Sequence, residues 1–277
     1  MKNKTIQLTS RIVQLDGRPV RLYEANPQSK EVVLFLHGFM SDATSIQEYI
    51  EQTGTSKRVI APDLPGFGES ERPSNVSLEG YAAWVSELCS ELRVNPVMVV
   101  GYSFGAYIAV QYILQQKSKA QLLLLCPVVH IRWQVRLYGK GFRLIALRNA
   151  AFAEKLYRMQ HDMTTLYVRR HKHPAIRKEL LRRRRDELDY LQSDIVLQLF
   201  TEFLRFDLLT YAKQITNSTI IITAARDNLA SNAATKKFAA MLRSKHVTHI
   251  DVRHAGHLLP IEEPYILALA TASYINE

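Results

Sequence analysis

The stretch VMVVGYSFGAYIAV, residues 97–110, predicts the central turn around which the fold is built. Its four apolar residues 97–100 predict a short strand buried on both faces, and the residues after Gly105 predict a helix. Between them, Gly-x-Ser-x-Gly is typical of a sharp strand–turn–helix connection that presents Ser103 as a nucleophile. Gly101 and Gly105 suit this turn because bulky side chains do not fit where the chain folds back on itself. The alternative is an ordinary serine in a glycine-flanked turn.

The composition is that of an ordinary globular protein. The chain has 277 residues, of which 47% are hydrophobic and 22% are charged, enough to bury a sizeable core. The N-terminal region has no apolar core typical of a signal peptide, and no apolar run reaches the length of a membrane-spanning helix. Cys89 and Cys126 are expected to be buried free thiols. We therefore expect a cytoplasmic protein.

Strand and helix patterns alternate on both sides of the central turn. Two strands within residues 5–25 meet at Asp16-Gly17, a strong hairpin signal. Further strands are predicted at 32–36, 58–64, 121–126, 219–223 and 247–252, and helices at 45–51, 78–92, 233–242 and 264–274. This alternation predicts an α/β fold with a mostly parallel sheet and helices on both faces.

Residues 128–213 interrupt the alternation. They contain no good strand pattern, and their apolar residues recur at helical spacing. We interpret them as a helical cap inserted before the last two strands. The core would then consist of residues 1–127 and 214–277.

The motifs of the core occur in a recognisable order. They are HGF at 37–39, DLPGFGES at 63–70, GYSFGA at 101–106, an acidic residue after a late strand at Asp227, and GHLLPIEEP at 256–264. In this order they resemble the α/β-hydrolase superfamily, in its form with a helical cap and a serine nucleophile. In open α/β sheets the ligand site lies beyond the carboxyl ends of the strands, which is where these motifs fall.

Ser103 needs a general base, because a free hydroxyl is a weak nucleophile. The resemblance implies that His257 is this base, since it follows the last strand and precedes the Pro-Ile-Glu-Glu-Pro turn. The chain order serine, acid, histidine also agrees with the family. His254, three residues earlier, is the alternative.

A carboxylate must orient the histidine and stabilise its cation. Asp227 follows a predicted strand and is our candidate, although Ala224 stands where the family usually has glycine in Gly-x-x-Asp. Asp207 and Asp251 are alternatives, although Asp207 is expected to be a helix-terminus residue and Asp251 lies inside a predicted strand. Asp63 is expected to form a turn in DLPG.

Two backbone N–H groups are expected to form an oxyanion hole. Phe104, directly after the nucleophile, offers one, and the resemblance implies that Phe39 offers the other. His37 and Gly38 are expected to support this segment.

Several chemistries are disfavoured. A serine at position 103 argues against the dehalogenases and epoxide hydrolases of this fold, which carry aspartate there. No metal-ligand spacing and no phosphate-binding loop occurs, so neither a metal nor a cofactor is expected.

The positive charge is concentrated in the predicted cap. The formal net charge is +10, and residues 128–213 hold 18 of the 36 Lys and Arg residues but only 9 of the 26 Asp and Glu residues. The densest run is Arg182, Arg183, Arg184 and Arg185. It is either a solvated helix face or a landing surface for an acidic acyl carrier protein, an anionic membrane surface or an acidic substrate. Nothing in the sequence indicates a nucleic-acid module.

These observations predict a serine esterase of the carboxylesterase type, acting on an ester or thioester through an acyl-enzyme. Its motifs are similar to those of the pimeloyl-acyl-carrier-protein methyl ester esterases of biotin synthesis. The alternatives are a carbon–carbon bond hydrolase or lyase with the same three residues, and a non-catalytic binding protein that retains the fold.

Overall fold

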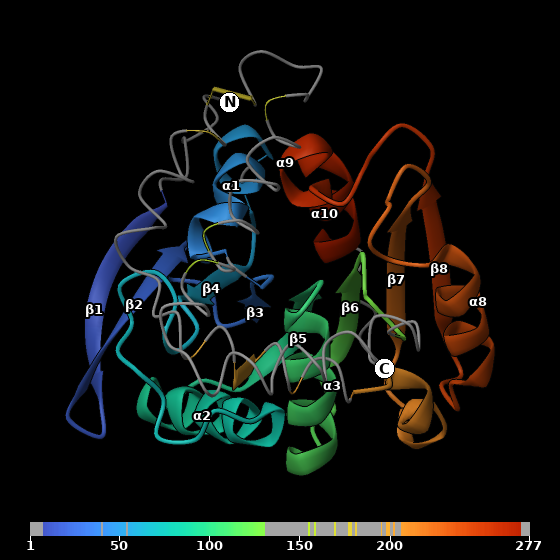
Figure 1. Cartoon of the computed structure of the whole chain (residues 1–277). Coiled ribbons are helices and arrows are strands. Elements are labelled where there is room, and N and C mark those ends of the chain that lie inside the picture. Colours follow the sequence, from blue (N-terminus) through green and yellow to red (C-terminus); the bar gives the residue numbers. More distant parts are fainter. Residues whose placement is uncertain are drawn as a thin grey trace.

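The computed structural model describes residues 8–39, 41–53, 55–130 and 206–272, with isolated positions between 155 and 202. Within these residues an eight-stranded sheet has the order β1-β2-β4-β3-β5-β6-β7-β8 (Figure 1). The strands are β1 Thr9–Leu15, β2 Arg18–Ala25, β3 Val32–Leu36, β4 Arg58–Pro62, β5 Pro96–Tyr102, β6 Gln121–Leu125, β7 Thr219–Ala224 and β8 Val247–Val252. β2 pairs antiparallel with β1 and β4, and the other pairs are parallel. The predicted mostly parallel sheet is confirmed.

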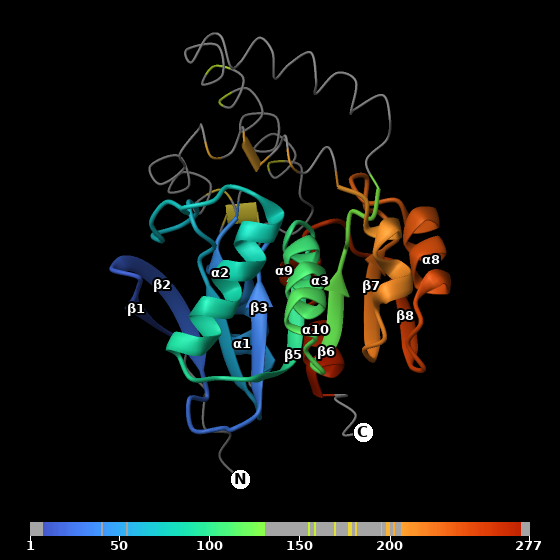
Figure 2. The ribbon, with the colours of Figure 1, turned by 90° about the horizontal axis from the view of Figure 1, so that it is seen from below.

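Helices cover both faces of the sheet. α2 (Leu78–Glu91), α3 (Gly105–Gln116) and α8 (Asn232–Met241) enclose one apolar cluster, and α1 (Gln47–Thr53), α9 (Leu259–Glu262) and α10 (Pro264–Ala272) enclose a second. Figure 2 shows α2 and α3 in front of the sheet, with α1 and α10 behind it. Alternate residues of the central strands enter the two clusters, as Leu34 and Val33 do, because successive side chains of a strand point to opposite faces.

The hairpin at the first edge forms as predicted. Asp16 and Gly17 both have positive φ, at 52° and 74°, as the tight turn between two antiparallel strands requires. The predicted helix at 45–51 differs in detail, because a 3₁₀ turn at Ala43–Ile46, capped by the Asp42 side chain, precedes α1. Asp42 accepts a hydrogen bond from the Thr44 N–H at 2.8 Å, and this cap draws the helix start earlier.

Most of the predicted cap lies outside the described residues, so its helical structure stays a prediction. Its two described ends lie side by side: His130 and Asp207 form an isolated bridge, and the Leu208 N–H donates to the Val129 carbonyl at 3.0 Å. Ile195 and Leu199 are helical and buried in the same cluster as α2 and α3. Among the described residues, no helix is both long and apolar enough to cross a membrane.

The connection from β5 to α3 is tightly packed. A Cβ atom on Gly105 would overlap the backbone carbonyl groups of Leu36 and His37, at the end of β3. On Gly101, a Cβ atom would lie 2.5 Å from the Ala106 Cα atom. Both glycines are therefore required by close backbone contacts, which agrees with the sequence prediction.

Gly105→Ala should destabilise the protein because two rigid carbonyl groups leave no room for a methyl group. We expect the free energy of unfolding to fall by about 3 kcal/mol or more, as for a severely overpacked site. Urea unfolding followed by circular dichroism measures the loss. Gly17→Ala is the control, since no atom lies within 4 Å of a Cβ atom added at Gly17. Only the backbone φ of 74° opposes a side chain there, and we expect this to cost about 1 kcal/mol. Equal losses in the two variants would contradict the steric argument.

Candidate active site

Ser103 stands at the end of β5 in a strained backbone conformation. Its φ is +51°, in a region that residues with a side chain rarely adopt. The Ser103 N–H donates to the Leu125 carbonyl at 2.9 Å, and α3 begins two residues later. The turn therefore holds the hydroxyl at the carboxyl edge of the sheet, beside the N-terminus of a helix.

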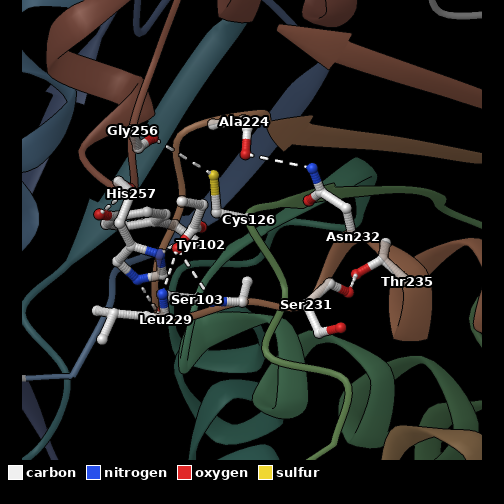
Figure 3. A network of polar contacts seen from close by, with 12 residues as sticks. Tyr102, Ser103, Cys126, Ala224, Leu229, Ser231, Asn232, Thr235, Gly256 and His257 are labelled. Atoms are coloured by element: carbon white, nitrogen blue, oxygen red, sulfur yellow. Dashed lines mark hydrogen bonds and ion pairs between the residues drawn. The ribbon is translucent and has the colours of Figure 1, made fainter. Parts of the chain in front are cut away.

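His257 connects Ser103 to Asp227. Its Nε2 atom lies 2.9 Å from the Ser103 Oγ, and its Nδ1 atom lies 2.7 Å from the Asp227 Oδ2. Figure 3 shows Ser103 and His257 facing each other. With the proton on Nδ1 donated to the carboxylate, Nε2 is free to accept the serine proton. The three side chains expected from the sequence are thus in one hydrogen-bonded chain.

Asp227 is held as an ionised carboxylate. It follows β7, and its Oδ1 atom accepts the N–H groups of Leu229 and Ala230 at 2.8 and 2.9 Å. Burial by itself would raise the pKa of Asp227, but the hydrogen bond and charge of His257 and the two N–H donors outweigh it, and the pKa is lowered. Ala224 in place of the usual glycine does not prevent this geometry.

Of the other candidates from the sequence, one histidine is exposed and two carboxylates make contacts elsewhere. His254 is exposed in the turn after β8. Asp207 caps the 3₁₀ turn Leu208–Thr210 and lies 2.9 Å from the His130 Nδ1 atom. Asp251, on β8, lies 3.2 Å from the Thr223 hydroxyl. These contacts of Asp207 and Asp251 do not involve Ser103 or His257.

His37 and Phe39 lie where β3 leaves the sheet. The His37 ring is fully buried; its Nε2 atom accepts the Leu64 N–H at 2.9 Å, and its Nδ1 atom lies 2.8 Å from the Gly38 carbonyl. Burial lowers the pKa of His37 to about 4, so the ring is neutral and donates from Nδ1. The Phe39 ring contacts that of Phe104, with centroids 5.7 Å apart. The segments carrying the two expected N–H donors are therefore neighbours.

Asp63 joins the segment after Phe39 to the DLPGFGES loop. Its carboxylate accepts the Ala43 N–H at 2.8 Å and the Glu69 N–H at 3.0 Å. Burial, followed by the charge of Asp42, raises the pKa of Asp63 to about 7 against the opposing effect of the two N–H donors. The expected turn-forming role is confirmed, and the contact with Ala43 was not foreseen.

Cys126 lies next to Asp227 and was not expected at the site. Its Sγ atom is 4.0 Å from the Gly256 carbonyl (Figure 3). Burial, and then the neighbouring Asp227 carboxylate, raise the pKa of the Cys126 thiol. A thiol that stays protonated is a poor nucleophile. The only sequence signal for this contact is that Cys126 is the last residue of a predicted strand whose carboxyl end faces the site.

Potential metal ligands are close together at one place among the described residues. Ligand atoms of Cys126, Asp227 and His257 lie within 4.8 Å of one another. However, the Asp227 carboxylate and the His257 imidazole are hydrogen-bonded to each other, and the raised pKa keeps the Cys126 thiol protonated. This arrangement favours proton transfer over metal binding. Arg182, Arg183, Arg184 and Arg185 lie outside the described residues.

Comparison with known proteins supports the fold. A family model described as the alpha/beta hydrolase family matches residues 33–269. An esterase from Exiguobacterium antarcticum superposes with a TM-score of 0.77 at 18% identity, covering 96% of this chain and 99% of that chain. The epoxide hydrolase CorEH gives 0.72 at 19% identity, covering 97% and 98%.

Similarity to curated sequences is more local. The magnesium-chelatase 30 kDa subunit of Rhodobacter capsulatus is 36% identical over 90 residues, 32% of each protein. The matched segments thus span about a third of the length of the first such relatives.

Stability should depend on pH through Asp63. The folded protein binds the Asp63 proton more tightly than the unfolded chain, in which the carboxyl has its ordinary pKa of 3.8. Asp63 therefore contributes stability that is fully present below that value and is lost as the pH rises through about 7. Urea unfolding between pH 5 and 7 should show the wild type losing up to about 1.4 kcal/mol per pH unit relative to Asp63→Asn. Parallel pH profiles for the two proteins would show that this carboxyl does not titrate as argued.

Proposed function

The chain belongs to the α/β-hydrolase family, and we propose that it is a serine hydrolase that cleaves a carboxylic ester or thioester through an acyl-enzyme on Ser103. The observation that carries this proposal is the chain of contacts of 2.7 and 2.9 Å from Asp227 through His257 to Ser103. These residue types in this arrangement are suited to acyl transfer, because His257 can accept the Ser103 proton while Asp227 orients the imidazole and stabilises its cation.

In the first half-reaction, the Ser103 Oγ attacks the carbonyl carbon of the ester while its proton passes to the His257 Nε2. The carbonyl oxygen becomes an oxyanion, which the N–H groups of Phe39 and Phe104 would stabilise. Collapse of this intermediate breaks the bond to the alcohol or thiol, which leaves with the proton from His257. The acyl group remains on Ser103.

In the second half-reaction, water attacks the acyl-enzyme. His257 takes a proton from the water, and the second tetrahedral intermediate releases the carboxylic acid as His257 returns the proton to Ser103. Asp227 remains a carboxylate throughout and stabilises the imidazolium ion that forms twice. Serine in place of aspartate at position 103 favours this route over the alkyl-enzyme route of dehalogenases.

The natural substrate that we propose is an ester presented by an acidic acyl carrier protein. The support for it is the excess of basic residues within positions 128–213, which we propose to form a cap over the core. Opposite charges would speed the encounter and make it sensitive to ionic strength.

Ser103→Ala should abolish hydrolysis of p-nitrophenyl esters, with a fall in kcat on the order of 10⁶, and should also abolish labelling by a fluorophosphonate probe. Asp227→Asn should lower kcat by about 10⁴, because the histidine loses its orienting charge. Ser90→Ala is the control, since Ser90 is exposed on α2 and its hydroxyl donates to the Ser86 carbonyl of the same helix. Retained activity in Ser103→Ala would refute the assignment, whereas labelling of the wild type without cleavage of any ester would favour carbon–carbon bond hydrolysis.

Replacing Arg182, Arg183, Arg184 and Arg185 together by glutamine should raise KM for a carrier-linked ester and weaken its dependence on salt. Hydrolysis of a small neutral ester should change by less than twofold, because such a substrate needs no electrostatic steering. Steady-state kinetics at low and high ionic strength measure both effects. Equal effects on the two substrates, or none on either, would leave these residues as a solvated surface.

A further inference from the structure

The segment Ala255–Leu258, which carries His257, has no regular secondary structure. It connects the turn after β8 to α9. The His257 ring is hydrogen-bonded to Ser103 and Asp227, but the position of its Cα atom is set by the backbone of this segment. Contacts to that backbone therefore decide how accurately the imidazole is placed.

The first such contact comes from Tyr102, the last residue of β5 and the neighbour of Ser103 in sequence. The Tyr102 hydroxyl donates to the His257 carbonyl at 2.7 Å, although the two residues are 155 positions apart. The Tyr102 ring lies against the imidazole, with centroids 5.7 Å apart, and Figure 3 shows the two side chains together. Tyr102 is buried, with 5% of its surface exposed, so few alternative conformations are open to it.

The second contact holds the backbone one residue before His257. The Gly256 N–H donates to the Glu262 Oε2 at 2.6 Å. Glu262 is the last residue of α9, and the N–H groups of Ile261 and Glu262 donate to the Leu258 carbonyl at 3.0 Å. The short helix α9 thus positions the Glu262 carboxylate that accepts the hydrogen bond from the Gly256 N–H.

We propose that Tyr102 and Glu262 are positioning residues, which hold the backbone at the His257 carbonyl and at the Gly256 N–H so that the His257 Nε2 stays in line with Ser103. This inference rests on the proposed function. Neither side chain needs to touch the substrate; both act through the backbone of His257. Small misplacements of a catalytic group lower turnover steeply, by up to about a hundredfold for 1 Å.

Tyr102→Phe removes the hydroxyl and leaves the ring against His257. We expect kcat for a p-nitrophenyl ester to fall about tenfold, with KM changed by less than twofold, and labelling by a fluorophosphonate to slow by the same factor. Tyr49→Phe is the matched control: it removes another buried phenol, which lies 2.9 Å from the Thr271 hydroxyl between α1 and α10. Its kcat should equal that of the wild type, even where its melting temperature falls as much as that of Tyr102→Phe.

Glu262 gives an independent test with a conservative variant. Glu262→Ala should lower kcat about tenfold, whereas Glu262→Gln, which keeps an oxygen able to accept the Gly256 N–H, should restore most of the activity. The inference is overturned if Tyr102→Phe and Glu262→Ala both keep the kcat and labelling rate of the wild type, or if Tyr49→Phe loses kcat equally. Failure of the proposed function looks different, because Ser103→Ala would then retain activity and labelling.

Discussion

The contact between the start of α3 and the end of β3 is the constraint on which the site depends. Gly105 lies so close to the carbonyl groups of Leu36 and His37 that no side chain fits between them. This approach forces the turn before it into the strained conformation of Ser103. It also brings the chain after β3 beside the nucleophile, so that Phe39 meets Phe104. One steric contact therefore places the nucleophile and the two expected oxyanion donors together.

Side chains that bond to backbone groups hold the loops around this contact. A buried carbonyl or N–H group that lacks a partner is costly, and these loops have little regular secondary structure to supply one. The His37 side chain accepts a hydrogen bond from the Leu64 N–H, and the Asp63 side chain accepts hydrogen bonds from the N–H groups of Ala43 and Glu69. The burial that strengthens these hydrogen bonds also lowers the pKa of His37 and raises that of Asp63, and both changes favour the neutral form of the side chain. The same environment thus provides rigidity and limits the number of charges near the site.

Much of the fold was predictable because its signals are local. Apolar runs, the Asp16-Gly17 turn and the glycines at 101 and 105 each reflect the chemistry of a few neighbouring residues, and the predicted family and mostly parallel sheet are confirmed. The positions of Ser103, Asp227 and His257 after strands could also be predicted from the sequence, whereas their catalytic roles stay a proposal. The contacts of Tyr102 were not predictable, since a hydrogen bond across 155 positions leaves no periodic trace. The sequence likewise could not reveal that burial raises the pKa of the Asp63 carboxyl, because that depends on the surrounding packing.

The pairing of β6 with β7 has a consequence for how the molecule reaches its native state. Leu122 pairs with Thr219, so a long excursion of the chain must close before the last two strands can join the sheet. Loop-closure entropy grows only with the logarithm of length, by about 0.6 kcal/mol per doubling, so such an excursion is tolerated at equilibrium. Its cost falls on the rate, because pairings distant in sequence form slowly. During synthesis the strands up to β6 and Ser103 emerge before Asp227 and His257. Assembly of the site is therefore expected to be among the last events of folding.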